Sequence, residues 1–125
     1  MQPMAASLAS GEEITAIAAY LAAMPATVPP VTVDGDAVNG EKLYISKCGA
    51  CHGGKGWGNE ALFTPRLTML GDAYVVRQVT KFQDGMRGTH ADATYGKQMA
   101  MVAKTVSAEE LNDIAAFLNE LAAGE

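Results

Sequence analysis

Two cysteines and a histidine within one five-residue window are the residues of this sequence best suited to chemistry. Cys48, Cys51 and His52 lie in the stretch KCGACHGG, and the 125 residues contain no other cysteine. Three kinds of site use such a cluster: a zinc site, a redox-active dithiol, and a haem joined to both cysteines by thioethers with the histidine on its iron. The rest of the sequence has to distinguish between these sites.

Zinc and dithiol chemistry both fit this window poorly. A tetrahedral zinc site needs four ligands, and His52 follows Cys51 so directly that sharing one site would strain the chain. The other histidine, His90, lies far along the sequence in an irregular segment. A thioredoxin-like dithiol belongs near a βαβ pattern, whereas here a predicted helix leads into the motif and glycines follow it. Haem attachment accounts for both cysteines and for the histidine.

A haem iron bound by His52 has one more position for a ligand. The candidates are four methionines and one histidine: Met69, Met86, Met99, Met101 and His90. A thioether suits an electron carrier, because it raises the reduction potential and closes the iron to substrates. Met99 and Met101 come late in the sequence and His52 comes early. A chain that wraps a flat ring needs such an arrangement, with one ligand from each part and the ring between them. Buried methionines commonly fill cores, and we expect this of Met69, Met86 and Met101, with His90 exposed in a loop.

The elements that must position these residues are all predicted to be helices. Apolar residues recur at helical spacing in four segments of the main domain: about 37–47, 73–84, 97–103, and from Ser107 onward. Ser107 with Glu110 three residues later matches a capping box, which marks the start of the last helix. No segment alternates strongly enough to predict a strand. The fold class is therefore all-α.

Two further segments precede this domain of residues 37–125. Residues 1–24 predict a loop followed by a helix with Ser10 as its N-cap, and residues 25–36, with three prolines, predict an extended linker. Met4–Met24 also resembles Met101–Leu121: each has a polar cap, paired glutamates and an Ile-Ala-Ala-aromatic-Leu core. We interpret this similarity as an internal duplication, with one complete domain and the tail of another.

The composition excludes several classes of protein. A formal net charge of −5 argues against a nucleic-acid-binding protein, which would show a basic patch. No stretch approaches the ~20 apolar residues of a transmembrane helix. The N-terminal apolar run has no basic residue before it and is interrupted by SGEE, so we expect no signal sequence in this chain. Aromatic residues make up only 6%, so a large apolar cofactor would help to fill a thin core.

Three stretches together resemble the class I c-type cytochromes, and in particular one domain of the dihaem cytochrome c-four branch. They are GEKLYISKCGACHGGKGWGN (40–59), TPRLTMLGDAYVVRQVTKFQDGMRG (64–88) and MAMVAKTVSAEELNDIAAFLNEL (99–121). The resemblance implies that residues 37–125 adopt the class I cytochrome c fold around one covalently attached haem. Residues 1–24 would then be an extra helix from the end of a preceding haem domain, beginning at or beside its axial methionine, Met1 or Met4.

The resemblance also implies roles for residues near the haem. Pro65 matches a proline whose carbonyl oxygen receives the other ring N–H of His52, which would orient the imidazole. Arg66 would lie near the haem edge and pair with a propionate. The axial methionine of this branch lies eight residues before the cap of the last helix, which is Met99, and Met101 is the alternative sixth ligand.

One further match concerns helix packing. Gly40 and Tyr44 match a glycine and an aromatic residue on the first helix of the domain. In the family this glycine allows the first helix to cross the last one closely, here against Ile114 and Phe117.

The function that the resemblance implies is electron transfer rather than catalysis. We expect a one-electron carrier, not an enzyme, that contains haem c and exchanges electrons by an outer-sphere route. Its partners would be periplasmic or membrane-bound redox proteins: an oxidase, a reductase or a dehydrogenase. Haem attachment in this family takes place outside the cytoplasm, which implies the bacterial periplasm. The alternatives are an electron-entry domain or subunit of a larger oxidoreductase complex and, less favoured, a haem-based ligand sensor.

The helix in residues 1–24 raises a separate question. Its apolar face, with Ile14, Ile17 and Leu21, has to be covered if the segment is retained. We expect either the main domain or a second copy of the chain to cover it, and the second case would give a homodimer.

Overall fold

The computed structural model describes residues 2–8 and 10–124. Its helices are α1 (Gln2–Ala5), α2 (Gly11–Ala22), α3 (Ala37–Lys47), α4 (Gly49–His52), a 3-10 turn η1 (Glu60–Leu62), α5 (Asp72–Gln83), α6 (Thr94–Ala103) and α7 (Ala108–Ala123). Within the described residues there is no strand, only one isolated bridge between Asn59 and Thr64. The all-α prediction is confirmed, with α6 beginning three residues earlier than expected.

The crossing of α3 over α7 forms the centre of the domain. Gly40 lies against α7 so closely that a Cβ atom there would collide with the carbonyl oxygen of Asp113 and lie 3.0 Å from Cβ of Phe117. Tyr44, one turn further along α3, is fully buried, and its ring centroid is 5.6 Å from that of Phe117. The predicted glycine crossing is present, with Asp113 rather than Ile114 beside Phe117 at the closest point.

The start of α7 also matches its prediction. The Ser107 hydroxyl oxygen accepts from the Glu110 N–H at 3.1 Å, and a Glu110 carboxylate oxygen accepts from the Ser107 N–H at 2.9 Å. This reciprocal pair is a complete capping box.

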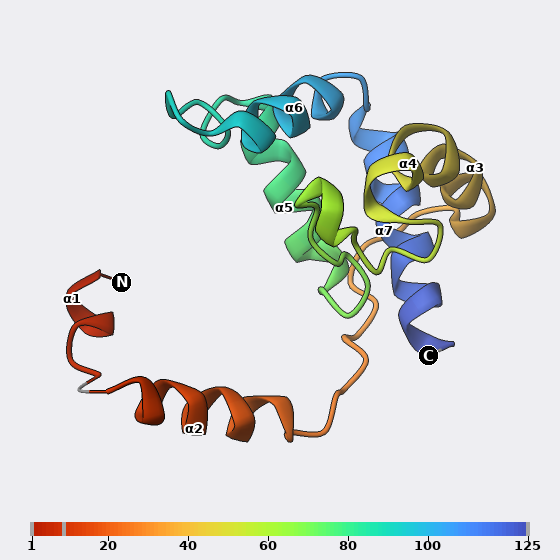
Figure 1. Cartoon of the computed structure of the whole chain (residues 1–125). Coiled ribbons are helices and arrows are strands. Elements are labelled where there is room, and N and C mark those ends of the chain that lie inside the picture. The colour runs from red at the N-terminus through yellow and green to blue at the C-terminus, as the bar shows by residue number, and fades with distance from the viewer. Residues whose placement is uncertain (1, 9, 125) are drawn as a thin grey trace.

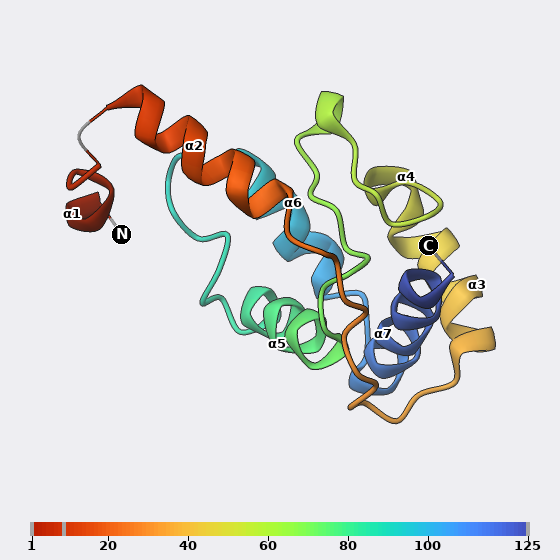
Figure 2. The same ribbon diagram turned by 90° about the horizontal axis from the view of Figure 1, so that it is seen from below.

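The helix α6 lies across the end of α5 (Figures 1 and 2), which in turn packs against α7. Nε2 of Gln83, at the end of α5, donates to the carbonyl oxygens of Ala103 and Val106 at 2.9 and 2.8 Å. Gly88 and Gly96 are in such close contact that a side chain at Gly88 would collide with the Gly96 carbonyl oxygen. These contacts attach one side of α6 to the helical core.

The segment predicted as a linker, residues 25–36, contains no helix, but its second half is bound to the domain. The backbone N–H groups of Thr32 and Val33 donate to the Asp72 carboxylate at 2.6 and 2.9 Å. Further along, the Asp36 N–H donates to Asp113 at 2.8 Å. Residues 32–36 therefore belong to the packed structure of the domain.

The helices α1 and α2 form an arm that extends away from the rest of the molecule (Figure 1). The cap of α2 forms as expected, with the Ser10 hydroxyl accepting from the Glu13 N–H at 3.2 Å. Ile14, Ile17 and Leu21 are 53, 44 and 58% exposed, and no described residue of α2 is buried. The expected packing of this face on the main domain is thus absent from the described structure.

The predicted preceding-domain methionine falls at Met1 or Met4. Met1 lies outside the described residues, and Met4 is 68% exposed on α1. Among the described residues, no helix is long and apolar enough to cross a membrane.

Candidate metal centre

A single turn of helix brings Cys48, Cys51 and His52 together. Cys48 ends α3, where its N–H donates to the Tyr44 carbonyl oxygen at 2.8 Å. Its own carbonyl oxygen then accepts from the N–H groups of Cys51 and His52 at 3.2 and 3.0 Å, which forms α4. Gly53 follows with φ of +79°, a conformation that favours glycine, and the chain leaves the helix there.

The imidazole of His52 is buried and held by a backbone acceptor. Its Nδ1 lies 2.9 Å from the carbonyl oxygen of Pro65, and the residue is 7% exposed. Because a carbonyl oxygen can only accept, Nδ1 must be the donor, which leaves the lone pair on Nε2 available to a metal. This is the hydrogen bond that the resemblance implied for Pro65.

The loop that carries Pro65 is tied back to the motif. The N–H of Gly58 donates to the His52 carbonyl oxygen at 2.8 Å, and the Thr64 hydroxyl donates to the Cys51 carbonyl oxygen. Asn59 and Thr64 exchange two backbone hydrogen bonds of 3.0 Å. A loop fixed at both ends keeps the Pro65 carbonyl aimed at His52.

The surroundings of the two cysteines offer little support to the other two chemistries. Cys48 and Cys51 form no disulfide. Burial raises the pKa of the Cys48 thiol to about 11, although the nearby Lys47 charge opposes that shift. A redox-active dithiol needs a thiol of lowered pKa, and burial moves the pKa of Cys48 in the other direction. Among the described residues, no group of three or more His, Cys, Asp or Glu side chains is placed to hold a metal ion such as zinc.

The candidates for the sixth ligand differ in their exposure to solvent. Met99 lies on α6 and is half-buried, whereas Met101 is 66% exposed and Met86 is 71% exposed. The expectation that Met86 and Met101 fill the core is wrong, because both lie on parts of the surface that no helix covers. Met69 is half-buried, with an unusual φ of +66°. His90 is exposed, as expected, with 79% of its side chain accessible.

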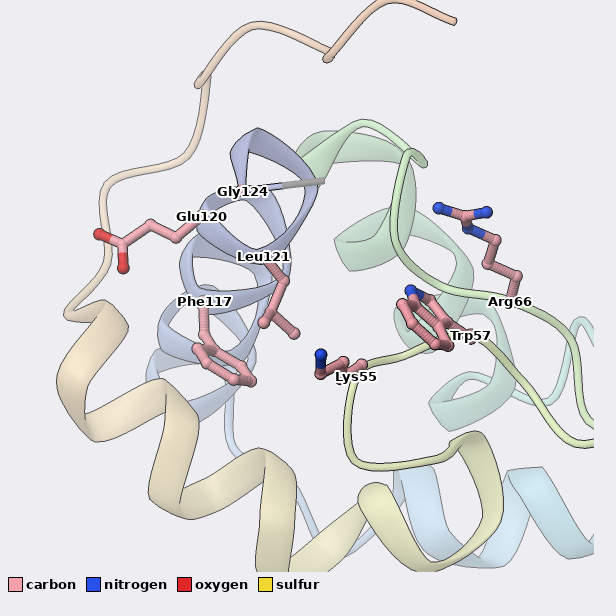
Figure 3. A pocket seen from close by; sticks show the side chains of 7 residues that line it. All are labelled: Lys55, Trp57, Arg66, Phe117, Glu120, Leu121 and Gly124. Carbon is pink, nitrogen blue, oxygen red and sulfur yellow. The ribbon is translucent and has the colours of Figure 1, made fainter.

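Arg66 lies beside a hollow of about 630 Å³ between the loop after α4 and the end of α7. Figure 3 shows Trp57 on the loop side and Phe117 and Leu121 on the α7 side, with the Glu120 carboxylate directed away from the hollow. Arg66 donates from Nε to the Thr68 hydroxyl at 2.9 Å. Arg66, which is predicted to contact the haem, lines this hollow, and its pairing with a propionate stays a prediction.

Asp72, which fastens residues 32 and 33 to α5, has no sequence signal that predicts this role. An acidic residue at the start of a helix ordinarily indicates only a favourable interaction with the helix dipole. Its long-range partners at Thr32 and Val33 leave no local pattern in the sequence. The same is true of Phe63 and Tyr95, whose rings stack across the surface.

The cytochrome c family model matches residues 37–122, which include the motif, the Pro65 loop, α5, α6 and most of α7. The chain belongs to the cytochrome c family. Proteins of this family carry haem c, attached covalently at a Cys-x-x-Cys-His motif, and haem c is the cofactor of this cytochrome.

Curated relatives of this cytochrome are longer proteins. It is 30% identical to a cytochrome c-552 of Acidithiobacillus ferridurans over 97% of its own length and 52% of that protein. It is 32% identical to a thiosulfate dehydrogenase electron acceptor of Stutzerimonas stutzeri, over 94% of itself and 56% of the relative. The chain thus spans about half the length of these curated relatives.

A solved structure shows the same fold. The cytochrome c4 of Acidithiobacillus ferrooxidans superposes with a TM-score of 0.64 at 26% identity, over 95% of this chain and 69% of the other. The residues present here fit a haem of this type: two cysteines that form no disulfide and a buried imidazole with Nε2 available lie on one turn of helix, and a half-buried methionine lies on α6.

Proposed function

We propose that this cytochrome is a one-electron carrier in which Cys48 and Cys51 hold the haem and His52 and Met99 bind its iron. The observation that carries the proposal is the 2.9 Å contact from His52 Nδ1 to the Pro65 carbonyl oxygen. It fixes the ring and its tautomer, so that Nε2 is the ligand atom. When bound, haem supplies an iron that exchanges one electron between its ferrous and ferric states.

The chain's own residues keep that exchange simple. His52 is immobilised by its backbone acceptor, and its loop is bonded to the motif at Gly58 and Thr64. A ligand that does not move when the charge changes keeps the reorganisation small, which favours fast outer-sphere transfer. Met99 on α6 completes a closed coordination shell in this proposal, and the soft sulfur favours a high potential. These features favour a carrier over a ligand sensor, which needs an open position.

The partners and location belong to the same proposal. One relative is named as an electron acceptor for thiosulfate dehydrogenase, and we infer that this cytochrome likewise takes electrons from a dehydrogenase and passes them to another redox protein. We place it in the bacterial periplasm, where haem attachment of this kind takes place. The longer relatives and the similarity of α2 to α7 support the proposal that residues 1–24 are the end of a preceding cytochrome domain.

A pair of neighbouring substitutions tests the ligand assignment. Met99→Ala should remove the methionine-sulfur-to-iron charge-transfer band from the ferric spectrum and increase azide affinity about 10-fold or more, because no internal ligand competes. Met101→Ala, the matched control on the same helix, should leave both unchanged, since Met101 is 66% exposed. Loss of the band in Met101→Ala with retention in Met99→Ala would reverse the assignment.

A further inference from the structure

The proposed ligand Met99 lies on a helix that the core holds along one side. Gln83 and the Gly88–Gly96 contact attach α6 to the end of α5. This attachment alone would leave the other side of α6 free to move outward. A methionine ligand on such a helix depends on whatever holds that second side.

Two aromatic rings make a contact on that second side. The rings of Phe63 and Tyr95 are stacked, with centroids 4.9 Å apart and planes 29° from parallel. Tyr95 lies on α6 four residues before Met99, so both side chains lie on the same face of the helix. Phe63 lies two residues before Pro65, whose carbonyl oxygen binds His52. The stack therefore joins the loop that orients one proposed ligand to the helix that carries the other.

The stack is unlike an ordinary core contact. Phe63 is 68% exposed and Tyr95 is 49% exposed, so the rings bury little surface by meeting. Phe63 also has φ of +53°, which is unfavourable for a bulky side chain. The surrounding loop enforces this conformation: the Phe63 N–H donates to the Glu60 carbonyl oxygen at 3.0 Å, and Asn59 pairs with Thr64. Backbone strain combined with little burial indicates a role other than general stability.

We propose that the Phe63–Tyr95 stack is a clasp that closes α6 onto the loop 59–65 and so keeps Met99 in the sixth position. The inference rests on the ligation proposed above. Phe63 and Tyr95 are positioning residues, since they act through Met99. Opening the clasp raises the fraction of molecules in which α6 has moved and the sixth position is accessible. An added ligand binds tighter in proportion to that fraction.

Azide binding to the ferric holoprotein measures this fraction. Tyr95→Leu and Phe63→Leu, which keep apolar bulk but remove the stack, should each increase azide affinity about 2- to 10-fold, the range expected for an aromatic pair. The double variant should gain no more than either single one, because either change already opens the clasp. Without azide, the methionine charge-transfer band should remain in Tyr95→Leu, in Phe63→Leu and in the double variant.

Two controls separate this role from a structural one. Tyr95→Phe keeps the stacked ring and should bind azide like the unchanged protein. Leu62→Ala removes an exposed apolar neighbour that is 44% accessible and should also have no effect on azide affinity. Thermal unfolding of each variant shows whether a change in azide binding merely follows lost stability.

The outcomes distinguish the two proposals. If azide affinity is unchanged in Tyr95→Leu and Phe63→Leu, and the band is lost only in Met99→Ala, the clasp proposal is overturned. The proposal that Met99 is the ligand then still holds. An increase in Tyr95→Phe equal to that in Tyr95→Leu also overturns the clasp proposal, because the ring would then not matter. A charge-transfer band that survives in Met99→Ala overturns the ligation, and the clasp with it.

Discussion

Asp72 connects the segment before α3 to the start of α5 through a single buried carboxylate. Burial acts to raise the pKa of this carboxyl, but the Thr32 hydroxyl and the N–H groups of Thr32, Val33 and Ala73 donate to it and hold the pKa well below its usual value of 3.8. Asp72 is 2% exposed, so its ionised form depends on these donors for compensation. Asp72 thus holds Thr32 and Val33 against α5, while Asp113 holds the segment again at Asp36.

Asp72→Asn should therefore lower the free energy of unfolding by about 1–3 kcal/mol near neutral pH, because an amide replaces a charged acceptor. The pKa of Asp72 is lower in the folded state than in the unfolded state. The carboxylate therefore stabilises the fold fully above its unfolded-state pKa, and this stabilisation is lost as the pH falls from that value towards the folded-state pKa. The difference between the unchanged protein and Asp72→Asn should consequently shrink below about pH 3.8. Denaturant unfolding at several pH values measures this difference in the free energy of unfolding. Asp34→Asn, at an exposed position of the same segment, is the control. A pH-independent difference would contradict this account.

Among the elements, the crossing of α3 and α7 determines where the motif lies. Gly40 allows the two helices to touch at the Asp113 backbone, and Tyr44 fills the space beyond, where its hydroxyl donates to the Gly53 carbonyl oxygen at 2.7 Å. Gly53 directly follows His52, so the crossing is linked to the ligand turn by one hydrogen bond. The position of α4 depends on this packing.

Gly40→Ala should destabilise the protein by about 1–3 kcal/mol, because the added methyl group collides with backbone that cannot yield. Gly11→Ala is the matched control: a Cβ atom at Gly11 meets nothing within 4 Å, and its effect should stay within about 0.5 kcal/mol. Urea unfolding of the two holoproteins gives the comparison. Equal stability of Gly40→Ala and the unchanged protein would show that α3 and α7 do not cross at this point.

The features that could be predicted from the sequence are those formed by residues close together in the chain. Ser107 and Glu110 define the start of α7 through their own hydrogen bonds, and the spacing of Cys48, Cys51 and His52 is a property of one helical turn. The exposure of Met86 and Met101 was not predictable in this way, since it depends on which distant helix covers them. The bonds to Asp72 and the Phe63–Tyr95 stack also join segments far apart in the sequence, and neither has a periodic pattern.

For the molecule as a whole, α2 and α7 show how the same pattern behaves with and without partners. Leu111, Ile114 and Leu118 of α7 are 2–3% exposed, whereas Ile14, Ile17 and Leu21 at the matching positions of α2 are 44–58% exposed. Both helices have a serine cap that accepts from a glutamate N–H. The sequence determines each helix locally, and burial follows only where α3 and α5 are present to cover it. This contrast supports the proposal that α2 belongs to a preceding domain.

The central claim is that one haem is bound covalently at Cys48 and Cys51. The intact mass of the protein isolated from its native host under denaturing conditions tests it most directly, because only a covalent haem survives unfolding. The mass should equal that of the mature polypeptide plus one haem for each Cys-x-x-Cys-His motif that the polypeptide contains, and a peptide spanning residues 48–52 should carry the haem through both sulfur atoms. A polypeptide mass with no haem, with both thiols free to react with an alkylating reagent, would contradict the account.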